Sequence, residues 1–139
     1  MTTSITPIVV RSTDLDAYGH VNNARYVEYF EWGRFDWLAD TGLGTQAKPD
    51  GSAYVVVNIN VAYRKEARLG DHLQLTTQLA SLGNSSFTMT QKLRNSAVDV
   101  VAEGEVVVAA FDPATRRGTP LPAAHRVLLA PQVVVSAAS

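Results

Sequence analysis

The sequence predicts an α+β domain in which one long helix is wrapped by a five-stranded antiparallel sheet. Between residues 22 and 40 there is no proline, and aromatic residues recur at three- and four-residue steps, which is typical of one helix face. After residue 52 the chain is rich in β-branched residues and in alternating apolar and polar residues, which favours strands. Short loops join the last of these segments, so antiparallel pairing is the simplest arrangement.

The first two predicted elements are a strand and the long helix. Residues 5–11 are β-rich, and the turn-forming residues that follow would end this strand. The helix should run from Asn22 to about Asp40. Asn22 or Asn23 can cap its start, because an amide oxygen can accept hydrogen bonds from the free N–H groups of the first turn. Gly42 suits its C-terminal end.

Four more strands should follow a loop at residues 42–52, which is rich in turn-forming residues. We expect them to form a meander, because the short loops GNS and RNSA link the last three. Residues 112–120 should form a final turn, residues 123–130 a short helix, and residues 131–139 a loosely held tail or a last edge segment. The four predicted strands span residues 53–65, 72–82, 86–94 and 98–111.

Length and composition limit the classes of function. The chain of 139 residues fits one domain, residues 1–139, with a core at about 5–122 and a short helix and tail at 123–139. Its 12 basic and 13 acidic residues leave no excess charge to attract nucleic acid or an anionic membrane. The absence of cysteine excludes disulfides, thiolate zinc sites and cysteine nucleophiles. The N-terminus is unlike a signal peptide and the apolar runs are too short to span a bilayer, so we expect a cytoplasmic protein.

The segment at residues 12–31, STDLDAYGHVNNARYVEYFE, gathers the residues most able to carry chemistry. Asp14 and Asp16 lie where the strand leads into the helix, whose first turn offers unpaired N–H donors and a partial positive charge. If Asp16 faces that helix end, the segment supplies a carboxylate as base or nucleophile and donors to polarise a carbonyl, which suits hydrolysis of an acyl bond. Both aspartates are equally suited to turns and caps, so spacing alone leaves the two interpretations open. Gly19 suits a turn with positive φ and lets a substrate approach the backbone.

Metal and cofactor chemistry are not expected. His20 follows Asp16 by four residues, a spacing that suggests a metal pair only within a helix, and the segment offers no third ligand. His72 and His125 are isolated and are interpreted as structural. Glu31 could point at the site of a partner subunit or could lie on a solvated helix face.

The stretch DLDAYGHVNNARYVEYFEWGRFDWL resembles the signature of the 4-hydroxybenzoyl-CoA thioesterase family, whose fold, a sheet wrapped around one long helix, is called the hotdog fold. VVVNINVAYRKEARLGDHLQL resembles the following strand pair of the long-chain acyl-CoA thioesterases linked to bacterial fatty-acid oxidation, and GNSSF resembles that family's hairpin. The similarity covers about residues 8–122. It implies an acyl-CoA thioesterase that converts a medium- to long-chain fatty acyl-CoA to free acid and CoA.

The resemblance also implies roles for particular residues. Asp16 matches the catalytic carboxylate, with Asp14 supporting it, and Asn23, seven positions later, matches the residue whose backbone N–H binds the thioester oxygen. The expected substrate-binding residues are Gly19, His20, Val21, Asn22, Val57, Asn58 and Ile59. The expected donors to the CoA phosphates are Arg64, Lys65, Arg68, Ser85 and Ser86.

A partner subunit is expected on two grounds. One helix covers only part of a five-stranded sheet, so valine-rich strands would leave apolar edges and faces exposed. The family resemblance adds that active sites lie at a dimer interface, which implies a homodimer at least and a dimer of dimers, a homotetramer, as the full assembly. Two rival functions are a hydroxyacyl dehydratase of the same fold, although its glycine–proline context is missing, and an acyl-CoA-binding regulator, although no DNA-binding helix is visible.

Overall fold

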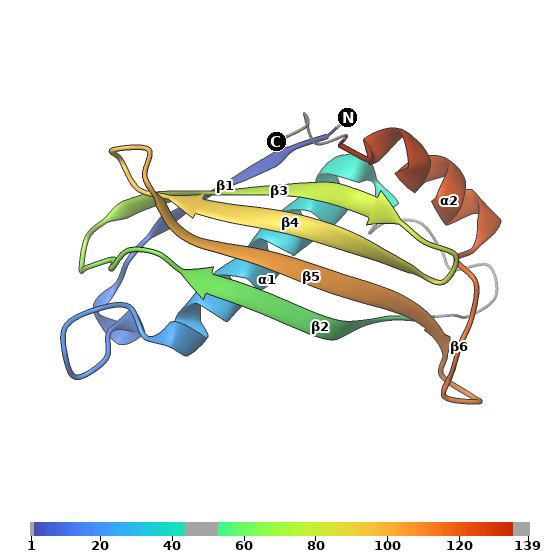
Figure 1. Cartoon of the computed structure of the whole chain (residues 1–139), viewed down its shortest axis with the longest axis horizontal. Coiled ribbons are helices and arrows are strands. Elements are labelled where there is room, and N and C mark those ends of the chain that lie inside the picture. The colour runs from blue at the N-terminus through green and yellow to red at the C-terminus, as the bar shows by residue number, and fades with distance from the viewer. Residues whose placement is uncertain (1, 44–52, 135–139) are drawn as a thin grey trace.

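The computed structural model describes residues 2–43 and 53–134, and in this part of the chain it has the predicted α+β architecture. An antiparallel sheet wraps one long helix, α1, which runs diagonally behind the strands in Figure 1. The helices are α1 (Asn23–Thr41) and α2 (Ala123–Leu129), with 3-10 turns at Ser12–Asp14 and Ala130–Gln132. The strands are β1 (Ser4–Val9), β2 (Ala53–Tyr63), β3 (His72–Leu82), β4 (Ser86–Arg94), β5 (Val100–Asp112) and β6 (Arg117–Gly118).

The strand order corrects one prediction. The main path of the sheet is β1-β3-β4-β5-β2, so β3, β4 and β5 form the predicted meander but β2 does not join it through β3. Instead, β2 pairs with β5 and lies at the edge (Figure 1). The β2–β3 connection is too long for a hairpin. It is bound instead to the segment before α1, since the Val21 N–H donates a hydrogen bond to the Ala67 carbonyl over 3.0 Å. The predicted final turn at residues 112–120 contains an additional two-residue strand, β6, paired with β5.

The long helix begins and ends as the sequence indicates. The Asn22 side chain accepts a hydrogen bond from the Ala24 N–H over 2.9 Å and caps the start. Gly42 ends the helix in the left-handed conformation, with φ of 78°. At Gly33 the helix lies so close to the sheet that an added Cβ would be 2.6 Å from Leu75 Cδ2, so glycine is required there.

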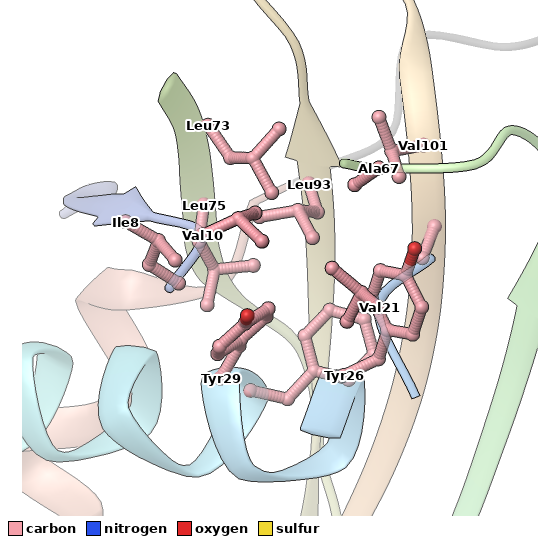
Figure 2. Packing of buried hydrophobic residues seen from close by; sticks show 12 residues of the cluster. Ile8, Val10, Val21, Tyr26, Tyr29, Ala67, Leu73, Leu75, Leu93 and Val101 are labelled. Atoms are coloured by element: carbon pink, nitrogen blue, oxygen red, sulfur yellow. The ribbon is translucent and has the colours of Figure 1, made fainter. Parts of the chain in front are cut away.

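Beneath α1 the inner face of the sheet carries two packed apolar clusters. Figure 2 shows Tyr26 and Tyr29 of α1 lying among Val21, Leu75 and Leu93. Leu75, Leu93 and Tyr29 are completely buried. A second apolar cluster surrounds Trp37, further along the helix. These two clusters fix α1 on β1 and β3, with which it makes its main contacts.

The inner face of β2 is open, in contrast to that of β3. Val57 is an extra residue in the register with β5, since Val56 pairs with Val108 and Asn58 with Val107. This bulge reverses the alternation of side chains, so Val56 and Ile59 both lie on the inner face. Both are more than one third exposed, and Val57 is 58% exposed. The edge strand therefore presents uncovered apolar surface.

The C-terminal part agrees with the predicted short helix, and Val133 of the following segment forms a parallel bridge with Leu79. Residues 135–139 of the predicted tail and residues 44–52 of the predicted loop lie outside the described residues. Within residues 2–43 and 53–134, no helix is both long and apolar enough to cross a bilayer.

Candidate functional site

The Asp16 carboxylate is held by its own turn. One oxygen, Oδ1, accepts hydrogen bonds from the N–H groups of Tyr18 and His20 over 2.8 and 3.2 Å. The Asp16 N–H donates to the His20 carbonyl over 2.8 Å, and Gly19 closes the turn with φ of 80°. In the described chain, Oδ2 accepts no hydrogen bond. The turn therefore fixes the orientation of the carboxyl group and leaves Oδ2 available for a reaction or a further hydrogen bond.

The start of α1 leaves one backbone donor unused. The Asn22 N–H donates to the Asp14 carbonyl over 2.8 Å, the Ala24 N–H to the Asn22 side chain, and the Arg25 N–H to the Asn22 carbonyl over 2.9 Å. The Asn23 N–H has no acceptor among the residues that the structure describes. Because it lies at the positive end of the helix dipole, it is suited to an oxyanion or a polarised carbonyl oxygen.

Asp16 and Asn23 line the same open cavity, which has a volume of about 450 Å³. The Asn23 carbonyl on its wall accepts a hydrogen bond from the Tyr63 hydroxyl over 3.0 Å, which ties the helix start to the end of β2. A carboxylate and a free N–H that belong to residues lining one cavity are the groups needed to attack and polarise a carbonyl. The other lining residues are His20, Val21, Asn22, Tyr26, Tyr63, Arg64, Lys65 and Glu66.

Asp14 has a different environment from Asp16. It is buried, and its carboxylate accepts a hydrogen bond from the Arg11 N–H over 2.9 Å. Arg25 lies 4.0 Å from it. Burial, and secondarily the Asp14 carboxylate, raise the pKa of the neighbouring Tyr29 hydroxyl. Asp14 thus holds the loop that carries Asp16.

His20 belongs to a polar network at the rim of the cavity. Its Nε2 lies 3.1 Å from a Glu66 carboxylate oxygen, and the same oxygen accepts from Arg68 over 3.1 Å. His20 and Arg68 also form an isolated β-bridge. The network joins the segment before α1 to the β2–β3 connection.

Comparison with known proteins identifies the family. A model described as the thioesterase-like superfamily matches residues 10–131. The chain belongs to this superfamily. This agrees with the family predicted from the sequence.

Individual members of the superfamily resemble the chain over most of its length. It is 41% identical over 106 residues to "Long-chain acyl-CoA thioesterase FadM" of Escherichia coli strain K12, covering 76% of each protein. It is 33% identical over 117 residues to "Acyl-CoA thioester hydrolase YbgC" of Escherichia coli O6:H1, covering 84% of this chain and 87% of the relative. The crystal structure of YbaW, a probable thioesterase from Escherichia coli, superimposes with a TM-score of 0.83 at 36% identity, covering 94% of this chain and 98% of that one.

In this thioesterase-like chain the basic residues predicted to bind phosphate already have acidic partners. Arg64 pairs with Glu103 and Lys65 with Asp99, each over 2.9 Å. These contacts hold the pKa of both carboxyl groups below their ordinary values. All four side chains are at least one third exposed. Another anion can therefore replace the carboxylate as the partner of Arg64 or Lys65 at little cost in free energy.

The other predicted site residues lie farther away within one subunit. Val57 and Ile59 are on β2, outside the residues that line the cavity, and Asn58 lies on the outer face of the sheet. Ser85 and Ser86 belong to the β3–β4 hairpin, at the opposite end of the sheet from the pair Tyr63 and Ala102 beside the cavity.

Sequence reasoning did not identify Tyr63 or Glu66 as residues of this region. Tyr63 follows Val61 and Ile59 in the inner-face alternation of β2, which was the available signal. Glu66 gave no signal, because its approach to His20 depends on the path of the β2–β3 connection. Among residues 2–43 and 53–134, no three potential metal-ligating side chains cluster together.

Proposed function

We propose that this acyl-CoA thioesterase hydrolyses medium- to long-chain fatty acyl-CoA to free acid and CoA, using Asp16 and the Asn23 N–H. The observation that carries the proposal is the shared cavity of these two groups, each with unused hydrogen-bonding capacity. The relatives named FadM and YbgC support an acyl-CoA substrate, and the first supports a long chain.

In the proposed reaction, the thioester carbonyl oxygen accepts a hydrogen bond from the Asn23 N–H. Charge that develops on this oxygen is stabilised by the positive helix end. Asp16 Oδ2 then either attacks the carbonyl carbon or takes a proton from an attacking water molecule. In the first route the C–S bond breaks as a mixed anhydride of Asp16 and the acyl group forms, and a water molecule then hydrolyses this anhydride to the free acid and the Asp16 carboxylate. In the second route the C–S bond breaks after water has added to the carbonyl carbon. In both routes the CoA thiolate leaves and takes up a proton. Incorporation of labelled oxygen from water into Asp16 during a single turnover distinguishes direct attack from base catalysis.

The CoA phosphates would lie at the rim, near Arg64, Lys65 and Arg68. Their exposed guanidinium and ammonium groups are close to the cavity that holds the thioester. A phosphate can replace an exposed carboxylate as their partner because surface ion pairs contribute little free energy. Ser85 and Ser86 could meet the same CoA only from a second subunit, since they lie at the far end of the sheet.

We also propose that two copies pair along β2, and that such dimers can pair again to form a tetramer. The sheet has two edges, and Pro7 interrupts the N–H groups of β1, whereas β2 contains no proline. A second β2 would satisfy the free edge and cover the apolar surface around Val57 and Ile59. These residues would then face the substrate path of both subunits.

The direct test is release of free thiol from acyl-CoAs of two to sixteen carbons by the purified full chain. We expect hydrolysis with the highest kcat/KM on medium or long chains. Binding without thiol release would contradict the enzyme and favour an acyl-CoA-binding regulator. Loss of water from a hydroxyacyl-CoA with the thioester intact would contradict it in favour of a dehydratase.

A further inference from the structure

A second cavity, of about 250 Å³, opens between the C-terminal half of α1 and the inner face of β2, β4 and β5. Most of its wall is apolar and includes Phe35, Val56 and Met89. Two charged side chains, Glu31 and Arg34, also line it. The thioester chemistry described above uses neither of them.

Arg34 is a buried cation with few partners. Its side chain is 8% exposed, and Nη1 donates to Gln91 Oε1 over 3.1 Å. Gln91 is in turn fixed by donating to the Phe30 carbonyl and to Thr77. The other guanidinium nitrogens donate no hydrogen bond to any residue of the described chain, and no carboxylate lies within 4.0 Å. These nitrogens are not among the fully buried polar atoms that lack a partner, so water in the cavity can reach them. An occupant that displaces this water must supply an oxygen acceptor, because an unpaired guanidinium in an apolar site is costly.

The electrostatic balance of the cavity favours a neutral polar group over an anion. Burial lowers the pKa of Arg34, and the negative charge of Glu31 partly offsets this effect. A carboxylate in the cavity would meet the repulsion of Glu31 as well as the attraction of Arg34. A hydroxyl group can accept from the guanidinium and donate to the carboxylate, so it satisfies both.

The position of the cavity relates it to the thioester site. Asn23 and Arg34 lie on the same helix, eleven residues or about 16 Å apart along its axis. The β2 side chains on the inner face from the first cavity to the second are Tyr63, Val61, Ile59 and Val56. Val61 packs against the core, whereas Ile59 and Val56 are more than one third exposed, so an acyl chain would cross apolar surface along the open edge of β2. An extended chain advances about 1.2 Å per bond, so about 13 bonds span this distance.

From these observations we infer that the Arg34 cavity is a tail subsite that selects acyl chains with a hydroxyl group about twelve carbons from the thioester. The inference rests on the proposed function, because the chain must be anchored at Asp16 and Asn23. Arg34 would donate to the hydroxyl oxygen, Glu31 would accept its proton in a hydrogen bond, and Phe35 and Val56 would enclose the last methylene groups.

The test compares kcat/KM for 12-hydroxydodecanoyl-CoA and dodecanoyl-CoA, and for 6-hydroxyhexanoyl-CoA and hexanoyl-CoA, by thiol release. We expect the wild type to prefer the hydroxylated twelve-carbon chain by about tenfold, which is typical of a hydrogen bond to a charged group. The six-carbon pair should show no preference, because its hydroxyl group cannot reach Arg34. Arg34→Met should abolish the twelve-carbon preference, since the hydroxyl oxygen would then have no donor, although Glu31 could still accept its proton.

Two further variants serve as controls for the effect of Arg34→Met. Lys92→Met, on the exposed outer face of β4, removes a cation without touching the cavity and should leave the ratio unchanged. Glu31→Gln keeps an acceptor and should reduce the preference only slightly. The inference would be overturned if the wild type and Arg34→Met had the same ratio of kcat/KM for 12-hydroxydodecanoyl-CoA to kcat/KM for dodecanoyl-CoA. It would also be overturned if this ratio in the wild type did not exceed the corresponding ratio for the six-carbon pair. The second comparison uses the wild type alone, so it decides the question even if Arg34→Met fails to fold. Hydrolysis of none of the four thioesters would instead contradict the proposed function.

Discussion

The two halves of the sheet's inner face are built from similar residues but have different surroundings. Under α1, β3 presents Leu75 and Thr77, which are completely buried. At the other edge, β2 presents Val56 and Ile59, which remain more than one third exposed. The first half carries the packing that holds the helix, whereas the second is left for a substrate chain and a second subunit. Substitutions in the two halves should therefore change different measurable quantities.

The largest effect is expected at the thioester site, at the margin of the open half. Asp16→Asn should reduce kcat by about 10²- to 10⁴-fold, because it removes the base or nucleophile. Asparagine keeps an Oδ1 that can accept from the Tyr18 and His20 N–H groups, so the thermal unfolding curve should change little. Thiol release and circular dichroism measure the two quantities.

A matched control for this variant is Asp71→Asn. The Asp71 carboxylate also accepts from a turn N–H, that of Arg68, but it does not line the site cavity. We expect it to retain kcat within about twofold, as is usual for surface substitutions. Near-normal turnover by folded Asp16→Asn would remove Asp16 from the mechanism.

The next largest effect separates the two halves by stability. Leu75→Ala should lower the free energy of unfolding by about 2–5 kcal/mol, because it leaves a cavity in a fully packed region. Ile59→Ala, on the open half, should cost less than about 1 kcal/mol at protein concentrations where the chain is monomeric. Urea unfolding measures both. Equal losses would mean that the inner face of β2 is already covered in the monomer.

The buried half of the inner face, under α1, is also the part that sequence reasoning predicted best. The step of aromatic residues from Tyr26 to Trp37 defined the helix, and Asn22 and Gly42 defined its ends. The predicted bounds of β3 and β4 coincide with those observed. Local periodicity and capping determine these features, and both depend only on residues that are close together in the sequence.

The open half depends on contacts distant in sequence, and there the prediction was incomplete. Three features were not predicted: the pairing of β2 with β5, the bulge at Val57 and the strand β6. They depend on the path of the chain across the sheet, which local sequence patterns do not determine. For the same reason the motif indicated Asp16 and Asn23, but not Glu66 or Tyr63, which approach them from the end of β2 and its connection to β3.

A third prediction tests the edge of the open half. Val57→Lys should raise the dissociation constant of the proposed dimer at least about tenfold, because it places a charge at a strand edge that would otherwise be paired. Ile5→Lys, on the exposed surface of the other edge strand β1, is the control and should leave association unchanged. Analytical ultracentrifugation measures both. An unaltered dimer in the Val57 variant would place the interface elsewhere.

The smallest effect concerns Tyr29, which is completely buried on the sealed side of the helix beside Asp14. Burial raises the pKa of its hydroxyl in the folded state, so the phenol stabilises the fold below its unfolded pKa of about 10 and this contribution is lost as the pH rises further. Tyr29→Phe should change stability little at pH 7, since the phenol is un-ionised there and phenylalanine keeps the buried ring.

Above pH 10, Tyr29→Phe should make the free energy of unfolding fall less steeply than in the wild type, as measured by urea unfolding at pH 7, 9.5 and 10.5. Part of the slope should remain, because burial also raises the pKa of Tyr26. Tyr18→Phe is the control, because Tyr18 is 86% exposed and its replacement should leave the slope unchanged. If Tyr29→Phe and the wild type lost stability equally, the Tyr29 hydroxyl would have to be reached by water in the folded state. The packing around α1 would then be less tightly closed than the contrast between the two halves requires.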